Sequence, residues 1–179
     1  MDSRFYKYVE LIIDNLEGGY FHPKFLNNAG VSEATKEVYS KSGETMYGMD
    51  RVAGAGLFKD GAGKEFWDLI DANSANWKWF YQPPASSDLA KKLKKLVAEI
   101  QYKNFCNLAD LYLKDQKTRK IVESSPKLMV HFFYGCWNGP GFFQNYAKKI
   151  TEAVTKKGIT NTSKLAKIAM DHRRNYFSK

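Results

Sequence analysis

The chain has 179 residues, of which 44% are hydrophobic and 26% are charged, and its net charge is +9. This length suits one domain, or one domain with two lobes, and the composition excludes a disordered chain. The two cysteines form no Cys-x-x-Cys pair and the three histidines are scattered. We therefore expect no metal site, no cofactor and no disulfide framework. A signal-peptide pattern and an apolar run of the ~20 residues that span a bilayer are both missing, so we expect synthesis in a cytoplasm and no membrane insertion.

The positive charge has two interpretations. It can belong to solvated lysine-rich helix faces, or it can attract a polyanion over long distances. Nucleic acid, an anionic membrane and a cell wall rich in carboxylates and phosphates all fit the second interpretation. The chain carries no nucleic-acid-binding motif, and its aromatic content of 15% suits stacking on sugar rings.

The first part of the chain predicts a helix followed by an irregular region. Residues 4–16 place apolar side chains at spacings of three and four, which predicts an amphipathic helix that Gly18 and Gly19 end. Residues 20–62 are rich in Gly, Asn, Ser and Lys with little periodicity. Within them we expect a short helix over 31–39 and a small hairpin or extended loop over 42–50.

From residue 63 onward the helical pattern returns. We expect a short helix over 64–70 and a long helix that Ser86 or Ser87 caps and that extends to about residue 112. Further helices are predicted over 115–124, 126–136, 142–155 and 163–176. The predicted fold is mainly α, a single domain over 1–179 with an irregular lobe at about 1–85 and a helical lobe at about 86–179.

Glu17 is the first candidate for chemistry, because it stands where the first helix ends and two glycines let the chain turn. Leu16, Tyr20 and Phe21 offer apolar surroundings, which keep a carboxylic acid protonated near neutral pH and suit it to donate a proton. The alternative is a solvated glutamate at a helix C-terminus, a position that the helix dipole disfavours.

A second polar segment, Ser42-Gly43-Glu44-Thr45-Met46-Tyr47-Gly48-Met49-Asp50-Arg51, follows the irregular region. Glycosidic cleavage uses an acid and, in most enzymes, a second carboxylate. Glu44 is our candidate for that carboxylate and Asp50 the second choice, since Asp50 can instead pair with Arg51. The Thr45 hydroxyl can position a water or simply belong to the turn.

Two further segments have balanced interpretations. Trp137-Asn138-Gly139-Pro140-Gly141 offers an amide for the hydroxyl or N-acetyl groups of a sugar. It can equally be a turn in which Asn138 caps the next helix. The aromatic run over 77–81 fits a core better than a sugar platform, and the lysines over 91–95 fit a solvated helix face.

The ordered segments resemble the N-acetylmuramidases of glycoside hydrolase family 108, phage endolysin-type enzymes of the lysozyme superfamily. That family's pattern is Glu-Gly-Gly, a loop, then Gly-Gly-x-Thr-x-Tyr-Gly-Ile, with Asn-x-Gly-Pro-Gly and a Gln nearer the C-terminus. The matching residues here are Glu17-Gly18-Gly19, then Gly43, Thr45, Tyr47 and Gly48, then Asn138 to Gly141 with Gln144. The family's aspartate-rich loop has no counterpart, because no aspartate lies between Glu17 and Asp50.

The resemblance implies a lysozyme-like, two-lobed fold and a peptidoglycan hydrolase that cleaves between N-acetylmuramic acid and N-acetylglucosamine. Glu17 would be the catalytic acid and Glu44 the second carboxylate. Contacts to substrate are expected from Tyr20, Thr45, Tyr47, Asp50, Trp137 and Asn138. One alternative is a lytic transglycosylase acting on the same bond, and another is a non-catalytic lysozyme-like protein of a virion that binds walls.

This resemblance also sets the expected partners and place of action. We expect a monomer that binds peptidoglycan strands, with other virion proteins as further candidate partners and without nucleic acid. The protein would be made in the host cytoplasm and act in the periplasm or cell wall. A holin would release it there, or a virion would deliver it.

Overall fold

The computed structural model describes residues 3–26 and 32–177. Within them the chain forms eight α-helices, three short 3-10 helices and one two-stranded sheet, which confirms a mainly α fold with a small hairpin. The chain divides into two compact units. The N-terminal unit is Val9–Ile100, and the C-terminal unit is Gln101–Lys179 together with Met1–Tyr8.

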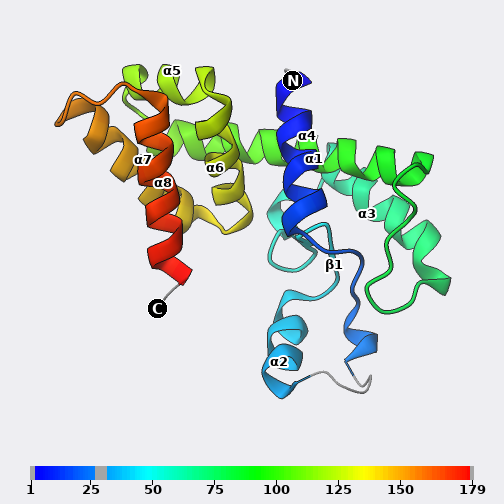
Figure 1. Cartoon of the computed structure of the whole chain (residues 1–179). Helices are drawn as coiled ribbons and strands as arrows, with labels where there is room; N and C mark the ends of the chain where they lie inside the picture. The colour runs from blue at the N-terminus through cyan, green and yellow to red at the C-terminus, as the bar shows by residue number, and fades with distance from the viewer. Residues whose placement is uncertain (1–2, 27–31, 178–179) are drawn as a thin grey trace. The chain divides into compact units, whose positions relative to one another are not determined.

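Two helices contribute residues to both units. They are α1, Ser3–Leu16, and the long helix α4, Asp88–Tyr112 (Figure 1). The division therefore falls inside α4, between residues 100 and 101, whereas the expected lobes meet at about residue 85. The reason is that α4 buries apolar side chains on both sides of this point, including Val97 in one unit and Phe105 in the other.

The N-terminal unit alternates helices with short irregular elements. Its other helices are α2, Glu33–Ser42, and α3, Gly61–Asn73, and its strands are β1, Thr45–Met46, and β2, Met49–Asp50. Three 3-10 helices lie at Pro23–Phe25, Ala55–Leu57 and Ser74–Asn76. The expected helix over 31–39 starts and ends about two residues later in the described residues, and residue 31 itself lies outside them. The helix expected over 64–70 is nearly twice as long.

Local chemistry accounts for the helices of this unit. Val9, Ile12 and Ile13 are buried along one side of α1, as the spacing of three and four predicts. Ser87 caps α4, because its Oγ accepts a hydrogen bond from the backbone N–H of Ala90 at 3.1 Å. The serine cap expected from the sequence is therefore confirmed at Ser87.

The C-terminal unit contains α5, Gln116–Ser124, α6, Pro126–Trp137, α7, Pro140–Thr155, and α8, Thr162–Phe177 (Figure 1). All four confirm the predicted helices to within about two residues. Ser125 and Asp115 cap α6 and α5 with their side chains. None of the helices in the described ranges is long and apolar enough to cross a membrane.

The core of the C-terminal unit forms where α6, α7 and α8 pack on one another. Gly135 in α6 allows this packing to be close, since a Cβ there would lie 3.3 Å from the ring of Tyr146 and 3.5 Å from the backbone of Phe143. The fully buried aromatic side chains of this core are Phe105, Phe132, Phe133, Phe143 and Tyr146.

Candidate functional site

Glu17 is the first residue after α1, and its backbone N–H continues the helix by bonding to the carbonyl of Ile13 at 3.4 Å. Its side chain is partly exposed. Gly18 and Gly19 then turn the chain, and Gly19 is tightly enclosed, because an added Cβ would collide with the backbone carbonyl of Tyr81. The next residue, Tyr20, bonds to that same carbonyl through its N–H at 2.8 Å. The second glycine of the motif is thus required by close backbone approach.

The polar segment folds as a tight hairpin. Thr45 and Met46 pair with Met49 and Asp50, and Tyr47 and Gly48 form the turn with φ of 50° and 69°. Two positive φ values in a two-residue turn match the twist of a β-hairpin, but they are unusual for a tyrosine. The hairpin expected over 42–50 is therefore confirmed.

Backbone hydrogen bonds join this hairpin to the glycine turn. The N–H of Tyr47 donates to the carbonyl of Gly18 at 3.1 Å. Phe21 and Thr45 exchange two further bonds, at 2.8 and 2.9 Å. Figure 1 shows the hairpin near the end of α1 from which Glu17 emerges. The two segments that the sequence singled out, 20 to 30 residues apart, therefore form one assembly.

Glu44 is held from both of its oxygens. Oε1 accepts a hydrogen bond from the hydroxyl of Tyr20 at 2.7 Å, and Oε2 pairs with the guanidinium of Arg51. Its side chain is only 14% exposed. Arg51 also binds both carboxylate oxygens of Asp71, at 2.7 and 2.8 Å, and it lies over the ring of Trp67. Through Arg51 and Asp71, these contacts fix the hairpin to α3.

The charges of this network perturb one another. The bidentate bond from Arg51 lowers the pKa of the Asp71 carboxyl below its ordinary value, and the two carboxylates raise the pKa of Arg51. Burial raises the pKa of the Tyr20 hydroxyl, and the bond to Glu44 adds to this. At neutral pH the group is a guanidinium shared by two carboxylates.

Asp50 has a different partner from the neighbour that the sequence suggests. Its Oδ1 accepts a hydrogen bond from the Thr45 hydroxyl at 2.6 Å, while Arg51 pairs with Glu44 and Asp71 instead. The alternative of an Asp50–Arg51 ion pair is therefore wrong. Burial raises the pKa of Asp50, and the bond from Thr45 opposes this only in part. Asp50 and Thr45 together form a half-buried carboxylate–hydroxyl pair.

The predicted substrate residues differ in their surroundings. Tyr20 and Tyr47 are buried, with exposed fractions of 1% and 3%, so in this structure they pack beneath the turn and hairpin. Burial raises the pKa of Tyr47 to about 12, with Asp14 and Tyr81 adding to the shift. Contact of these two tyrosines with a substrate stays a prediction.

Trp137 and Asn138 belong to the C-terminal unit and not to this group of contacts. Trp137 is the last residue of α6, and Asn138 follows it. The amide of Asn138 donates to the carbonyl of Tyr134 at 2.8 Å. Asn138 thus caps the C-terminal end of α6. The sequence-based alternative, in which Asn138 caps the start of the next helix, is wrong, because Gly139 is the N-cap of α7. A sugar contact from this exposed amide stays a prediction.

Two residues of the site, Asp71 and Phe80, were not predicted. Phe80 has a positive φ of 49° and a side chain that is 41% exposed. Its ring lies 3.4 Å from the position that a Cβ on Gly18 would take, and therefore beside the residue that follows Glu17. Strained backbone that presents an exposed aromatic ring is typical of functional sites. The aromatic run over 77–81 was the signal that could have indicated Phe80. Which of its rings are buried depends on tertiary packing, and in the structure Trp77 is buried while Phe80 is exposed.

Comparisons with known proteins found no match: no protein-family model fits the chain, and no curated protein or solved structure is significantly similar to it. The candidate site is therefore defined by its own geometry. In the described ranges, no three His, Cys, Asp or Glu side chains gather in a way that could hold a metal ion.

Proposed function

We propose that this protein is a peptidoglycan-cleaving glycosidase that acts between N-acetylmuramic acid and N-acetylglucosamine. The observation that carries the proposal is the hydrogen bond between the Gly18 carbonyl and the Tyr47 N–H. It ties the segment that carries Glu17, at the end of α1, to a hairpin that carries a second carboxylate and a hydroxyl. Most enzymes that hydrolyse a glycosidic bond use an acid and a second carboxylate.

Glu17 would protonate the leaving oxygen. The C-terminal end of α1 disfavours its ionised form, and the ring of Phe80 next to Gly18 adds an apolar neighbour. Partial exposure leaves the carboxyl open to a substrate. Glu17 thus combines partial exposure with a position at a helix end and an aromatic ring nearby.

The contacts distinguish the two candidates for the second carboxylate. Glu44 is committed to Tyr20 and Arg51, which suits a residue that fixes the hairpin or supplies a constant negative charge. Asp50 has one neutral partner, the Thr45 hydroxyl. We therefore favour Asp50 with Thr45 for orienting a water, and the assignment of Glu44 as the second carboxylate stays a prediction to be tested beside it.

The first test is clearing of purified sacculi by the wild type and by Glu17→Gln. Glu10→Gln is the matched control, because Glu10 is a partly exposed glutamate of the same helix. We expect the wild type and Glu10→Gln to clear the suspension and Glu17→Gln to lose at least a hundredfold in rate, since a positioned general acid contributes about 10²–10⁴-fold. Equal clearing by Glu17→Gln with an unchanged melting temperature would show that Glu17 is not the acid.

A lytic transglycosylase is the second candidate, and the double engagement of Glu44 favours it. Such an enzyme needs only one acid, because the muramic acid closes an anhydro ring on itself and no water enters. Its products are lighter by one water than those of a hydrolase, so mass spectrometry of the released muropeptides separates the two reactions.

The proposed reaction takes place outside the compartment in which the protein is made. Release by a holin or delivery with a virion would bring it to the wall. If the wild type binds sacculi and clears none of them, the structural or wall-binding alternative replaces the enzyme.

A further inference from the structure

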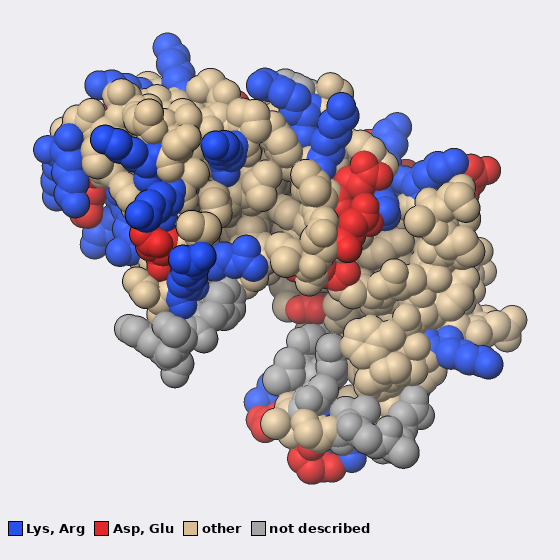
Figure 2. All heavy atoms as spheres, viewed as in Figure 1, with Lys and Arg blue, Asp and Glu red and all other residues tan. Residues whose placement is uncertain are grey.

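The positive charge is confined to one unit. The C-terminal unit holds 17 of the 28 Lys and Arg residues but only 6 of the 19 Asp and Glu residues, so its net charge is +11. The N-terminal unit, with 11 basic and 13 acidic residues, has a net charge of −2. Figure 2 shows Lys and Arg side chains spread over the C-terminal helices. The unit that carries Glu17 therefore does not account for any of the overall positive charge.

At least eight of these 17 basic residues are lysines that form no ion pair within the described residues. Arg119 is taken up by Asp110 and Glu123, at 2.6 and 2.8 Å, and Arg173 lies over the ring of Tyr134 at 3.9 Å. In the described part of the chain, no carboxylate lies within ion-pair distance of the lysines of the linker, α5, α7 and α8 at positions 114, 117, 120, 148, 149, 157, 164 and 167. These ammonium groups remain available to an external anion.

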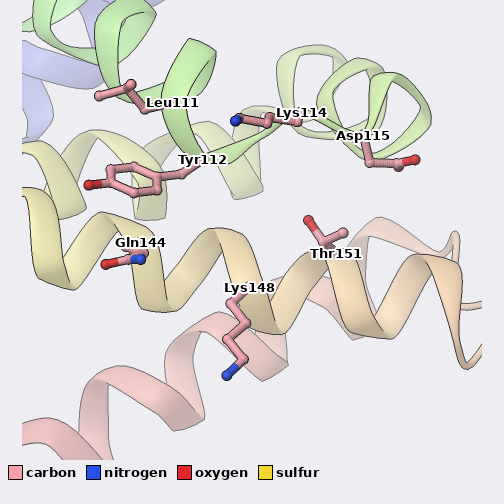
Figure 3. A pocket seen from close by; sticks show the side chains of 7 residues that line it. All are labelled: Leu111, Tyr112, Lys114, Asp115, Gln144, Lys148 and Thr151. Carbon is pink, nitrogen blue, oxygen red and sulfur yellow. The ribbon is translucent and has the colours of Figure 1, made fainter.

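Two of the lysines border a pocket of about 320 Å³ between the end of α4, the linker to α5, and α7. Its lining residues are Leu111, Tyr112, Lys114, Asp115, Gln144, Lys148 and Thr151. Figure 3 shows Tyr112 and Lys114 on one side of the gap and Gln144 and Thr151 rising from α7 on the other. The side chain of Lys148 extends from α7 away from the gap, so its ammonium group lies at the rim.

The polar groups of this pocket differ in whether they have hydrogen-bond partners. Asp115 is committed to capping α5, because its carboxylate accepts from the N–H and the hydroxyl of Thr118. The hydroxyl of Thr151 is buried and has no hydrogen-bond partner within the described residues, and in Figure 3 it points toward the linker. A buried hydroxyl without a partner is costly unless a ligand or water satisfies it. Leu111, with 59% of its side chain exposed, adds an apolar edge.

We propose that this pocket and the lysines around it bind a carboxylate-bearing segment of the peptidoglycan, and so hold the enzyme on its substrate polymer. The choice of polymer rests on the proposed function. Lysine acts as a point charge, which suits carboxylates that are scattered along a polymer. The Tyr112 ring, the Leu111 side chain and the Gln144 amide suit a sugar or peptide next to the carboxylate.

The test measures binding and not cleavage, so that it is independent of the proposed activity. The full chain with Glu17→Gln is sedimented with purified sacculi at low salt. The test variant adds Lys114→Glu and Lys148→Glu. The matched control adds Lys59→Glu and Lys95→Glu, two exposed lysines of the N-terminal unit, and makes the same change in net charge.

We expect the Lys114/Lys148 variant to bind at least tenfold more weakly and the Lys59/Lys95 variant to change by less than threefold. We also expect amidation of the sacculus carboxylates to abolish binding of the parent. Melting temperatures check the fold, and Lys114→Gln with Lys148→Gln repeats the test without charge reversal.

Three outcomes would overturn the inference. An equal loss of sacculus binding in both double variants would show that binding depends on net charge and not on this pocket. Undiminished binding to amidated sacculi would exclude carboxylates as the ligand. A loss confined to duplex DNA in a parallel arm would assign the pocket to nucleic acid. Failure of clearing by the wild type would refute the proposed function alone, since this binding experiment uses no catalysis.

Discussion

At the scale of single residues, the site separates two carboxylates that look equivalent in the sequence. Glu44 and Asp50 flank the same two-residue turn, yet one shares a guanidinium with Asp71 and the other accepts from a hydroxyl. The free-energy consequences differ accordingly. Removing a charge from an ion-paired network leaves its partner uncompensated, whereas neutralising a buried carboxylate without a cation costs little.

This contrast yields a paired prediction. Asp50→Asn keeps the acceptor for Thr45 and removes a charge that burial disfavours, so we expect unchanged or slightly higher stability and a large loss of lytic activity. Glu44→Gln loses the bond to Arg51, and we expect it to unfold about 1–2 kcal/mol more easily while keeping most activity at low temperature. Urea unfolding and clearing assays check both. A stable but inactive Glu44→Gln would instead make Glu44 the second carboxylate.

A second prediction concerns Phe80. Its positive φ is a conformation that glycine adopts without strain, so Phe80→Gly relieves backbone strain of about 1 kcal/mol while losing exposed ring contacts. We expect nearly unchanged stability. We also expect a several-fold higher KM for soluble glycan strands. Phe58→Ala, an aromatic truncation elsewhere in the same unit, serves as the control for general loss of packing. A change in stability without a change in KM would make Phe80 purely structural.

The hydrogen-bond and ion-pair partners of the site residues could not be predicted from the sequence. The bonds from Tyr20 to Glu44 and from Arg51 to Asp71 join residues 24 and 20 positions apart. The neighbour Arg51 was the natural partner for Asp50 by proximity in the chain, but the strand geometry directs adjacent side chains to opposite faces. Glu17 and the two glycines could be singled out because a helix end and a sharp turn are local properties.

At the scale of elements, the helices were predictable and the connections were not. A helix of three or more turns repeats its apolar positions often enough to be recognised in the sequence. The bounds of the helices α4 to α8 therefore agree with the predicted bounds to within about two residues. The 3-10 helices of the irregular region are single turns that leave no such pattern. The hairpin depends on Tyr47 at a positive φ, which propensity disfavours and tertiary packing imposes.

The packing of α6, α7 and α8 predicts a pH dependence. Burial, with Arg173 nearby, lowers the pKa of His131 below its ordinary 6.5, and burial likewise lowers that of His172. Between pH 6.5 and the lower folded values, the unfolded chain binds more protons than the folded chain. The free energy of unfolding therefore falls as pH decreases through this window.

Thermal melts from pH 7.5 to 5 measure this effect. We expect the melting temperature to drop toward pH 5 in the wild type and less steeply in His131→Gln. His172→Gln tests the second histidine of this packing in the same way. Parallel curves for all three proteins would show that His131 is not responsible.

At the scale of the whole molecule, the positive net charge belongs to one unit and the candidate site to the other, and we propose that the first binds the polymer while the second cleaves it. The net charge of +9 was visible in the sequence, but its confinement could not be predicted before the unit boundary was known. The lysines of α4 over 91–95 are the denser cluster in the sequence, yet they lie in the N-terminal unit. One of them, Lys94, is buried and pairs with Asp14 at 2.6 Å.

This division predicts a specific dependence on salt. Raising NaCl from 50 to 300 mM shortens the Debye length from about 14 Å to about 6 Å, so we expect binding to sacculi to weaken by an order of magnitude or more. Turnover of short GlcNAc–MurNAc oligomers whose lactyl carboxyl groups have been amidated should change by less than twofold, because it depends on the N-terminal unit. Salt effects of equal size on both would contradict the division.

The long helix α4 has a further consequence for how the protein can be taken apart. Its 25 residues extend over about 37 Å, and the unit boundary lies at its thirteenth residue. Cutting the chain after residue 100 would expose the apolar stripe of half a helix in each fragment. The two units are therefore not modules that recombination could exchange as separate genes, and proteolysis at the boundary should require global unfolding. We therefore expect the two units to be inherited together and to unfold in a single cooperative transition.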